Sequence, residues 1–419
     1  MSVSVSRLLL GLHPHGRPLD AGEHLHLHGP LPGPLDRSSL LDAVERSALG
    51  GRGGAGFPTA LKLRAVAGRR GRKVVLANGV EGEPPSGKDK VLLRYVPHLV
   101  LDGVEVAAQA VGADQAVVAV SRAAAVELAV LQKALRDRGR SDRVEIRIAA
   151  VPDAFVAGEE TALVNAVTGG PPRPTATPPR PFERGIDARP TLVQNVETLA
   201  QLALIARHGP VWFREIGTQG EPGSTLVTLS GAVRLPGVYE VPLGTPLHDL
   251  VAEAGGATQP PRAVLVGGYF GTWLDARTAF NSELSEASLG SVGAILGARA
   301  LVVLPEGSCA LAEVARVSRY LAGESAGQCG PCVHGLAAVA QATASLFRGE
   351  GSYGELRIRR WLDQVEGRGG CRHPDGAARF VRSALDVFAD EVALHARGEP
   401  CSGRDLRLLP VRRQERKAA

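Results

Sequence analysis

Between residues 38 and 215, short apolar runs alternate with segments whose apolar side chains recur at helical spacing. The apolar runs predict strands over Lys73–Ala77, Gln115–Val120 and Val144–Ala149. The segments at helical spacing predict helices near residues 38–45 and over Pro97–Val111, Ala123–Leu135 and Asn195–His208. This alternation indicates an α/β layer with a parallel or mixed sheet, whose ligand-binding loops lie at the ends of the strands.

The pattern changes near residue 223, where two short apolar runs flank a turn. Thr225–Leu229 and Val238–Val241 predict a hairpin, because Pro236-Gly237 between them is a turn signal. A helix over Pro246–Ala254 and a strand over Ala263–Val266 follow. A unit of this size and order predicts a small α+β domain of the β-grasp type.

From residue 309 to residue 397 the pattern is almost wholly helical, with breaks expected at 322–335 and 348–375, which is typical of a helical bundle. We therefore predict an α/β domain, then a β-grasp domain, then a helical bundle. The expected parts are an N-terminal extension (1–37), the α/β domain (38–215), the β-grasp domain (216–300), the helical domain (301–405) and a basic tail (406–419).

The N-terminal extension carries three histidines that alternate with leucines. His24, His26 and His28 would lie on one face of an extended strand. A surface metal site is one interpretation. We favour an edge strand with solvated histidines, because no cysteine or acidic partner follows them.

Composition narrows the class of protein. The chain has 419 residues, of which 44% are hydrophobic and 22% charged, which is typical of a globular protein with two to four domains. Much of the net charge of +5 lies in the tail, at Arg412, Arg413, Arg416 and Lys417, and does not indicate nucleic-acid binding. No apolar run approaches the roughly 18 residues of a membrane span, and Leu8–Leu10 is too short for a signal peptide. We expect a cytoplasmic protein without membrane insertion.

A glycine-rich loop, Gly51–Gly56, leads through Phe57 and Pro58 into a predicted helix containing Lys62. Backbone N–H groups at such a loop and helix start form an anion site. The loop fits the G-x-G-x-x-G pattern, but a helix precedes it where the dinucleotide fingerprint requires a strand. We therefore expect a phosphate-bearing ligand in a fold other than the ordinary dinucleotide fold. A flexible linker is less favoured, because linkers rarely contain Phe-Pro.

Three further segments carry candidate chemistry. Asn78–Ser86 follows a predicted buried strand and places two carboxylates where a ligand rim is expected. Glu159 and Glu160 lie at a helix start, where the helix dipole by itself explains them. Cys329 and Cys332 form a C-x-x-C pair, which in a reducing compartment suggests a metal or redox centre.

In this order, the segments resemble the NADH-binding flavoprotein subunit, the F subunit, of bacterial respiratory complex I and its relatives in bidirectional hydrogenases and soluble formate dehydrogenases. The resemblance runs from about Leu41 to Ala396 and includes the motif Pro190–Ala200. It implies that FMN binds in the α/β domain, that hydride comes from NADH, and that single electrons pass to a [4Fe–4S] cluster in the helical domain. The middle domain would be the family's soluble-ligand-binding (SLBB) β-grasp.

The resemblance also implies which residues hold the cofactors. The FMN and its phosphate would be cradled by Gly51, Gly53, Gly54, Ala55, Gly56 and Lys62. The flavin would be lined by Asn78, Glu81, Gly158, Glu159, Asn195 and Thr198. Positions that contact NADH in the family keep Phe57, Glu83 and Glu160. No acid–base catalytic residue is implied, because hydride transfer requires only positioning.

The chain departs from the family at several of these positions. Val80 replaces an acidic residue beside the flavin, which would shift the flavin potential or weaken binding. Ala65 and Arg180 stand where the family has stacking phenylalanines, and Thr177 stands where it has a lysine. We expect weaker nucleotide binding, with Arg180 stacking on the adenine or favouring the 2′-phosphate of NADPH.

The cluster motif has lost its first cysteine, which is Ala326 here, while Cys329, Cys332 and the remote Cys371 remain. We favour an iron–sulfur cluster with three cysteine ligands, either [4Fe–4S] with one labile iron or [3Fe–4S]. A structural zinc completed by His334 or His373 is the second interpretation, and a vestigial site is the third. Cys309 and Cys401 are expected to be an ordinary buried cysteine and an ordinary tail cysteine.

The leading hypothesis is therefore an electron-transfer subunit that takes hydride from NAD(P)H onto FMN and passes electrons to the cysteine-held centre. Its partners would be a thioredoxin-like [2Fe–2S] subunit or a ferredoxin within a larger redox complex. One alternative is a flavoprotein that exchanges electrons only between protein partners. The other is a non-redox scaffold that has lost both cofactors, against which the intact glycine loop argues.

Overall fold

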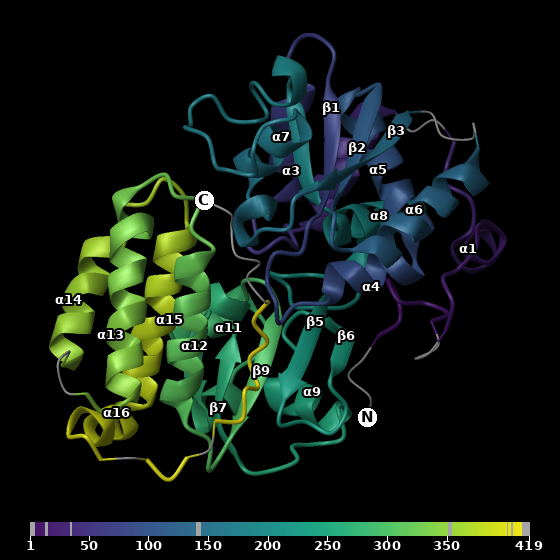
Figure 1. Cartoon of the computed structure of the whole chain (residues 1–419). Coiled ribbons are helices and arrows are strands. Elements are labelled where there is room, and N and C mark those ends of the chain that lie inside the picture. The colour runs from purple at the N-terminus through teal and green to yellow at the C-terminus, as the bar shows by residue number, and fades with distance from the viewer. Residues whose placement is uncertain are drawn as a thin grey trace. The chain divides into compact units, whose positions relative to one another are not determined.

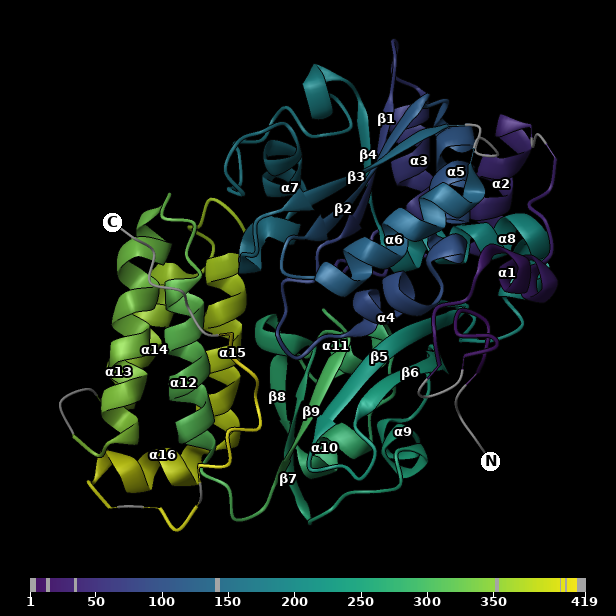
Figure 2. The ribbon, with the colours of Figure 1, turned by 45° about the vertical axis from the view of Figure 1, so that its right-hand side comes forward.

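The computed structural model describes residues 5–12, 16–33, 36–139, 144–350, 354–399, 401–403 and 405–412 (Figures 1 and 2). The chain forms two compact units. The first comprises Met1–Gly82, Gly87–Val227 and Val238–Thr245, and the second comprises Glu83–Ser86, Thr228–Gly237 and Pro246–Ala419.

The first unit is built on a four-stranded parallel sheet. Its strands are β1 (Val74–Gly79), β2 (Gln115–Ser121), β3 (Glu145–Val151) and β4 (Thr191–Asn195), in the spatial order β3-β2-β1-β4. The strands predicted from the three apolar runs are confirmed, and the sheet is parallel throughout. The chain adds β2 and β3 on one side of β1 and then returns to add β4 on the other side, so the strand order reverses between β1 and β4.

Helices cover both faces of this sheet. They are α1 (Ala21–His28), α2 (Arg37–Ser47), α3 (Thr59–Ala67), α4 (Lys88–Tyr95), α5 (Pro97–Val111), α6 (Ala125–Arg138), α7 (Glu160–Val167) and α8 (Val196–Phe213). Short 3₁₀ turns occur at Phe155–Gly158 and Ile186–Ala188. The helix predicted over Pro97–Val111 has the same bounds as α5, and α2, α6 and α8 confirm the other predicted helices.

The strands β1 and β2 are buried on both faces, which is why their sequences are continuous apolar runs. The edge strand β3 exposes Glu145 and Arg147. Val75 and Ala77 of β1 pack into the larger core with α2, α3, α5 and α8. Val74 and Leu76 point the other way, into a smaller core with Leu163 of α7. Figure 2 shows α7 on one face of the sheet and α3 and α5 on the other.

The extended strand predicted for the three histidines of the N-terminal extension is wrong, because these residues form α1. Asp20 caps the helix by accepting a hydrogen bond from Glu23 N (2.9 Å), and Glu23 accepts in return from Asp20 N (3.0 Å). This capping box satisfies two N–H groups at the helix start. The alternation of histidine and leucine is compatible with a strand. The N-terminal cap favours a helix instead, in which His24 and His28 are buried and His26 is exposed.

The buried His24 belongs to a charged network around Asp102 of α5. Its Nε2 lies 2.7 Å from Asp102 Oδ2, Arg138 NH1 lies 2.7 Å from Asp102 Oδ1, and Arg207 also contacts Oδ2. Burial by itself raises the pKa of Asp102, but the hydrogen bond from His24 and the two arginines outweigh it and hold that pKa well below its usual value. The network links α1, α6 and α8 to α5.

The second unit contains most of a five-stranded sheet with the order β6-β5-β9-β7-β8. The strands are β5 (Ser224–Gly231), β6 (Gly237–Pro242), β7 (Pro261–Val266), β8 (Thr272–Asp275) and β9 (Ala300–Pro305). β5 runs parallel to β9, which is antiparallel to β7, and β7 is antiparallel to β8. The predicted strands β5, β6 and β7 are confirmed, whereas the sequence pattern does not single out β8 and β9. Short helices α9 (Leu247–Glu253), α10 (Ala276–Phe280) and α11 (Glu286–Ser291) and a 3₁₀ turn at Gly268–Phe270 connect the strands.

The rest of the second unit is helical. α12 (Ala310–Gly323), α13 (Ala337–Phe347), α14 (Glu355–Val365) and α15 (His373–Val387) form the bundle, and α16 (Ala389–Ala396) lies across one end of it (Figure 1). A π-helical turn, Pro331–Leu336, precedes α13. The break predicted over 348–375 is wrong in part, because α14 occupies its centre. Only Ile358, Leu362 and Val365 of that helix are buried, so the many polar residues between them hide the helical repeat.

The bundle and the sheet of the second unit share a core around Trp273 of β8. Its ring lies 5.3 Å from that of Phe388 and 6.1 Å from that of Phe380 in α15, measured between centroids. Trp273 N also donates to Ser383 Oγ (3.0 Å). These contacts fix α15, at whose start Cys371 lies. Across the described ranges, no helix combines the length and the apolar character needed to cross a membrane.

Candidate functional site

Asn78 and Asn195 occupy partner positions at the carboxyl ends of the parallel strands β1 and β4. This is the point at which the strand order reverses, and in open α/β sheets ligands bind in the crevice outside such a reversal. The tertiary structure therefore selects one edge of the first unit as the candidate ligand site, and both asparagines were predicted to line it.

The glycine loop is a closed loop between α2 and α3. Gly51 N donates to Phe57 O (2.9 Å), and Thr59 N donates to Leu49 O (2.9 Å). Gly54 has φ +113° and Gly56 has φ +62°, which are backbone conformations that side chains disfavour. The helix α3 begins at Thr59, with Pro58 as its N-cap residue, and contains Lys62 as predicted.

This loop rests on the junction of β4 and α8. Arg52 N donates to Thr198 Oγ1 (2.8 Å), and a Cβ added at Gly53 would lie 3.1 Å from Asn195 Cβ. The absence of a side chain at Gly53 thus lets the loop approach the end of β4. The structure brings the predicted loop residues together with Asn195 and Thr198.

A third segment, the 3₁₀ turn before α7, joins the same edge. Asn78 Nδ2 donates to Gly158 O (2.8 Å), and a Cβ at Gly158 would lie 2.8 Å from Val80 O. Asn78 Oδ1 also accepts from Val80 N (3.1 Å). Val80, for which the resemblance implies an acidic residue, is buried in the smaller apolar core.

The two adjacent glutamates have different partners. Glu159 caps α7, with Oε2 accepting from Thr161 N (3.0 Å), Ala162 N (2.9 Å) and the Thr161 hydroxyl (2.6 Å). Glu160 instead pairs with Lys62 of α3, with 2.7 Å between Oε2 and Nζ. Both side chains of this ion pair are 29% exposed, so a bound anion can reach the ammonium group.

Glu81 is buried in the segment that follows β1. Its carboxylate accepts from Asp89 N (3.3 Å) and Lys90 N (3.4 Å) at the start of α4. A carboxylate at a helix N-terminus is favoured by the helix dipole. Glu81 therefore fixes the loop after β1 against α4.

Sequence reasoning missed a buried ion network behind Asn195. Lys88 Nζ lies 2.6 Å from Asp89 Oδ1 and 3.0 Å from Glu197 Oε2, and Asn195 Nδ2 donates to Asp89 Oδ2 (2.8 Å). Glu197 Oε1 accepts from Thr225 Oγ1 (2.8 Å) and Leu226 N (2.9 Å). The network orients the Asn195 amide. The available signal was the Lys88-Asp89-Lys90 run in a short helix beside an apolar one.

The positions predicted for the nicotinamide nucleotide are divided between the units. Phe57 and Glu160 lie in the first unit, and Phe57 is 53% exposed. Glu83 lies in the second unit, where its Oε2 accepts from Tyr269 N (3.0 Å). Arg180 and Thr177 are exposed, and Ala65 is half-buried on α3.

The three predicted cluster cysteines gather at the starts of α13 and α15. Cys332 lies in the π-helical turn, Cys329 just before it, and Cys371 two residues before α15. Burial raises the pKa of Cys332 to about 12, and the neighbouring thiols of Cys329 and Cys371 contribute to this rise, while a hydrogen bond with Ser325 opposes it. Single π-helical turns often mark functional sites, because they re-aim a side chain.

The two histidines considered as a further ligand have different environments. His373 is buried, and its Nε2–H donates to Leu321 O (2.8 Å). Burial lowers the pKa of His373. His334 is exposed in the π-helical turn.

The donor sets fit the implied cofactors to different extents. The first unit offers a glycine cradle without Cβ atoms, a lysine and two oriented amides, which fit a phosphate-bearing flavin. The predicted cluster site in the second unit offers three thiols, from Cys329, Cys332 and Cys371, whereas a cubane takes four. Ala326 supplies no donor.

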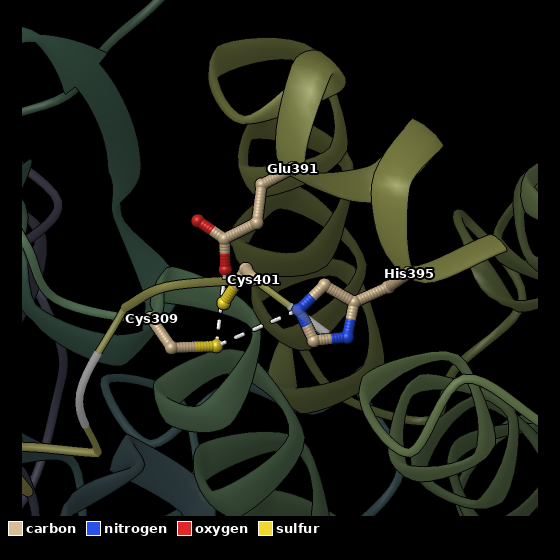
Figure 3. A group of neighbouring side chains, drawn as sticks. All are labelled: Cys309, Glu391, His395 and Cys401. Carbon is tan, nitrogen blue, oxygen red and sulfur yellow. Dashed lines mark hydrogen bonds between the residues drawn. The ribbon is translucent and has the colours of Figure 1, made fainter. Parts of the chain in front are cut away.

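The structure also gathers a second group that contains the two remaining cysteines. The ligand atoms of Cys309, Glu391, His395 and Cys401 all lie within 4.8 Å of one another (Figure 3). Cys309 is buried as expected, but sequence reasoning gave it and Cys401 no common role.

Three protein families match consecutive parts of the chain. The Nuo51 FMN-binding domain matches residues 44–204, the SLBB domain matches residues 226–268, and the NADH-ubiquinone oxidoreductase-F iron-sulfur binding region matches residues 312–395.

Relatives that align over most of the chain agree with these matches. One of the NADH-quinone oxidoreductase F subunits of Rhizobium meliloti, F 2, is 34% identical, with 86% of this chain and 90% of the relative aligned. The HndC subunit of the NADP-reducing hydrogenase of Solidesulfovibrio fructosivorans is 29% identical over 87% of this chain and 77% of its own. Among solved structures, an NAD⁺-reducing [NiFe]-hydrogenase in the air-oxidized state is similar, with a TM-score of 0.83 and 31% identity over 93% of this chain and 67% of that chain.

Proposed function

Since the chain belongs to the family of NADH-quinone oxidoreductase F subunits, we propose that it oxidises NAD(P)H through FMN held by the glycine-loop site. Electrons then pass to an iron–sulfur centre on Cys329, Cys332 and Cys371. The observation that carries the proposal is the contact of the glycine loop with Asn195 and Thr198, at the point where the strand order reverses.

Each element of the site has one task in this proposal. The N–H groups of Gly51–Gly56 and the start of α3 bind the phosphate, and Lys62 supplies the cation. Asn78 and Asn195 present amide groups whose orientation is fixed by Gly158 O and by Asp89. When bound, FMN accepts two electrons as hydride and releases them singly.

The proposed nucleotide site contains fewer side chains than the proposed flavin site. Phe57 offers a stacking face, and Glu160 offers a carboxylate that Lys62 holds in place. No side chain of the site has to accept or donate a proton in the hydride step, because the site acts by orienting the two rings. The positioning of the two rings, and not a general base, would therefore govern the rate.

In the second unit, three thiolates would hold the iron–sulfur centre. Cys332 is buried in the π-helical turn, while Cys329 and Cys371 are half-buried, so the centre would lie near the protein surface. A surface position suits electron transfer to a second protein. We propose a thioredoxin-like [2Fe–2S] subunit or a ferredoxin as that partner, within a larger redox complex. Its cytoplasmic location is part of the same proposal, since NAD(P)H is available there.

The test begins with protein purified without air. The absorbance spectrum should contain flavin and iron–sulfur bands, and NADH or NADPH should bleach the flavin in a stopped-flow experiment. Gly54→Val should strip the flavin by placing a branched side chain beside the ligand. Since Gly54 has φ +113°, the control is Gly71→Val at φ +86°, an exposed glycine with open space around it. Full flavin content in Gly54→Val would contradict the assignment.

Two other results would support the two alternative functions. Flavin that neither nucleotide reduces, but that a reduced ferredoxin does, would indicate exchange between protein partners only. Purified protein that has neither flavin nor iron, and that binds no added FMN, would indicate a scaffold.

A further inference from the structure

The side chains of Cys309, Glu391, His395 and Cys401 form a compact group of metal-ligating atoms outside the proposed redox sites (Figure 3). Cys309 is the N-cap residue of α12, and Glu391 and His395 lie four residues apart on α16, hence on one helical face. Cys401 follows the end of α16. The first three residues are at most 4% exposed, which excludes an ordinary surface cluster.

The distances in this group suit a tetrahedral ion. Cys309 Sγ lies 3.1 Å from Glu391 Oε1 and 3.9 Å from His395 Nε2. Zinc bonds of 2.0–2.3 Å place ligand atoms about 3.3–3.8 Å apart around a tetrahedron. Small side-chain rotations would bring the four atoms to these separations.

The histidine is already in the tautomer that a metal requires. His395 Nδ1 lies 2.7 Å from Phe347 O, and because a carbonyl can only accept, Nδ1 carries the proton. Nε2 is therefore the nitrogen with a free lone pair, and it points toward Cys309 and Cys401 (Figure 3). A backbone carbonyl that orients a ligating histidine in this way is a common feature of zinc sites.

The surrounding charge would balance the ion. Arg262 NH1 lies 2.5 Å from Glu391 Oε2, and Leu311 N donates to Oε1 (3.0 Å). Two thiolates and one carboxylate carry three negative charges, which Zn²⁺ and Arg262 together neutralise. Binding would release the thiol protons of Cys309 and Cys401 to solvent.

We propose that Cys309, Glu391, His395 and Cys401 bind a structural zinc ion that attaches the C-terminal segment to α12 and α16. Backbone contacts place this segment at the site, since a Cβ at Gly403 would lie 2.6 Å from Cys309 N. Farther along, Arg316 NH1 donates to Leu409 O (2.5 Å). The four protein side chains would occupy all four coordination positions of the zinc ion, so no position would be open for catalysis.

The site can be distinguished from the cluster cysteines by paired variants. Metal analysis of protein purified without air should find about one zinc per chain, which four N/S/O ligands hold tightly. Cys401→Ser and His395→Gln should lose this zinc and keep their iron. Cys332→Ser should lose iron and keep its zinc. Hydrogen exchange at residues 405–412 should speed up in Cys401→Ser and His395→Gln but not in Cys332→Ser.

A second measurement does not depend on the folding of variants. Wild-type protein stripped of zinc by a chelator and refilled with Co²⁺ should show the visible bands of tetrahedral cobalt and thiolate-to-cobalt charge transfer. Wild-type protein without zinc, or zinc that persists in both Cys401→Ser and His395→Gln, would overturn the proposal. So would a Cys309–Cys401 disulfide in protein purified without air, detected by thiol alkylation and mass spectrometry.

Discussion

Lys62 of α3 and Glu160 of α7 form an ion pair at the edge of the first unit, with 2.7 Å between Nζ and Oε2. The resemblance assigns Lys62 to FMN and its phosphate and Glu160 to the nucleotide. In the structure the two groups restrain each other. A phosphate that binds the glycine loop would share the Lys62 ammonium with the Glu160 carboxylate, which couples the two predicted ligand positions.

Lys62→Met should therefore weaken FMN binding while leaving the fold intact. A hydrogen bond to a charged group contributes about 1.5–3 kcal/mol, so the dissociation constant should rise by roughly one to two orders of magnitude. Titration of the apoprotein with FMN, followed by quenching of flavin fluorescence, measures this. Arg64→Met on the same helix is the control, because Arg64 pairs with Asp42 and Glu45 on the exposed side. Equal FMN affinity in Lys62→Met and Arg64→Met would show that Lys62 does not bind FMN.

Ala65→Phe should tighten nucleotide binding by restoring an aromatic face. Stacking of a base on an aromatic side chain contributes about 1–3 kcal/mol, so the dissociation constant should fall by roughly tenfold or more.

Arg180→Ala should weaken the binding of NADPH more than that of NADH, since the guanidinium group is exposed and available to a 2′-phosphate. Stopped-flow reduction of the flavin by each nucleotide gives both constants. Saturation of the wild type at low micromolar NADH, without an NADPH preference, would contradict both expectations.

Ala326→Cys should make the iron–sulfur centre more stable in air. With three thiolates, one iron is labile, and we expect the wild-type centre to interconvert between [4Fe–4S] and [3Fe–4S]. A fourth thiolate should suppress the [3Fe–4S] signal in EPR spectra and raise the iron and sulfide content after exposure to air. Ala326→Ser is the size-matched control and should behave like the wild type. If zinc and no iron is found at Cys329, Cys332 and Cys371, the result would contradict the cluster and indicate a structural zinc site.

The first unit should lose stability as pH falls from about 6.5 to about 4. Burial lowers the pKa of His28 and of His98 to about 4 in the folded protein, with the charges of His24, Arg207 or Arg138 adding to the effect and Asp102 opposing it. The unfolded chain therefore binds more protons in this window, and the free energy of unfolding decreases.

At about 1.4 kcal/mol per pKa unit, reduced by screening, the two histidines together should cost about 2–4 kcal/mol at pH 4. Urea unfolding between pH 4 and pH 7.5 measures this slope. His28→Gln should flatten it, whereas His26→Gln, at an exposed position of the same helix, should leave it unchanged. A slope unaffected by His28→Gln would assign the pH dependence to other groups.

The sequence by itself determined the strands β1, β2 and β3, the helix α5 and the identity of the glycine loop. Strands buried on both faces read as apolar runs, and α5, which is buried almost all round, reads as an apolar helix. Local patterns of this kind predict an element because its own residues carry the information. The same holds for the glycine loop, whose positive φ angles at Gly54 and Gly56 require residues without side chains.

Other features of the protein were determined only by the tertiary structure. α1 forms because Asp20 and Glu23 cap it and because His24 is buried against Asp102, which a period of two in the sequence does not reveal. The ion network of Lys88, Asp89 and Glu197 depends on the junction of β4 and α8. Cys309, Glu391, His395 and Cys401 become neighbours only when α12, α16 and the C-terminal segment pack together. Such contacts join residues far apart in the chain, so no local pattern encodes them.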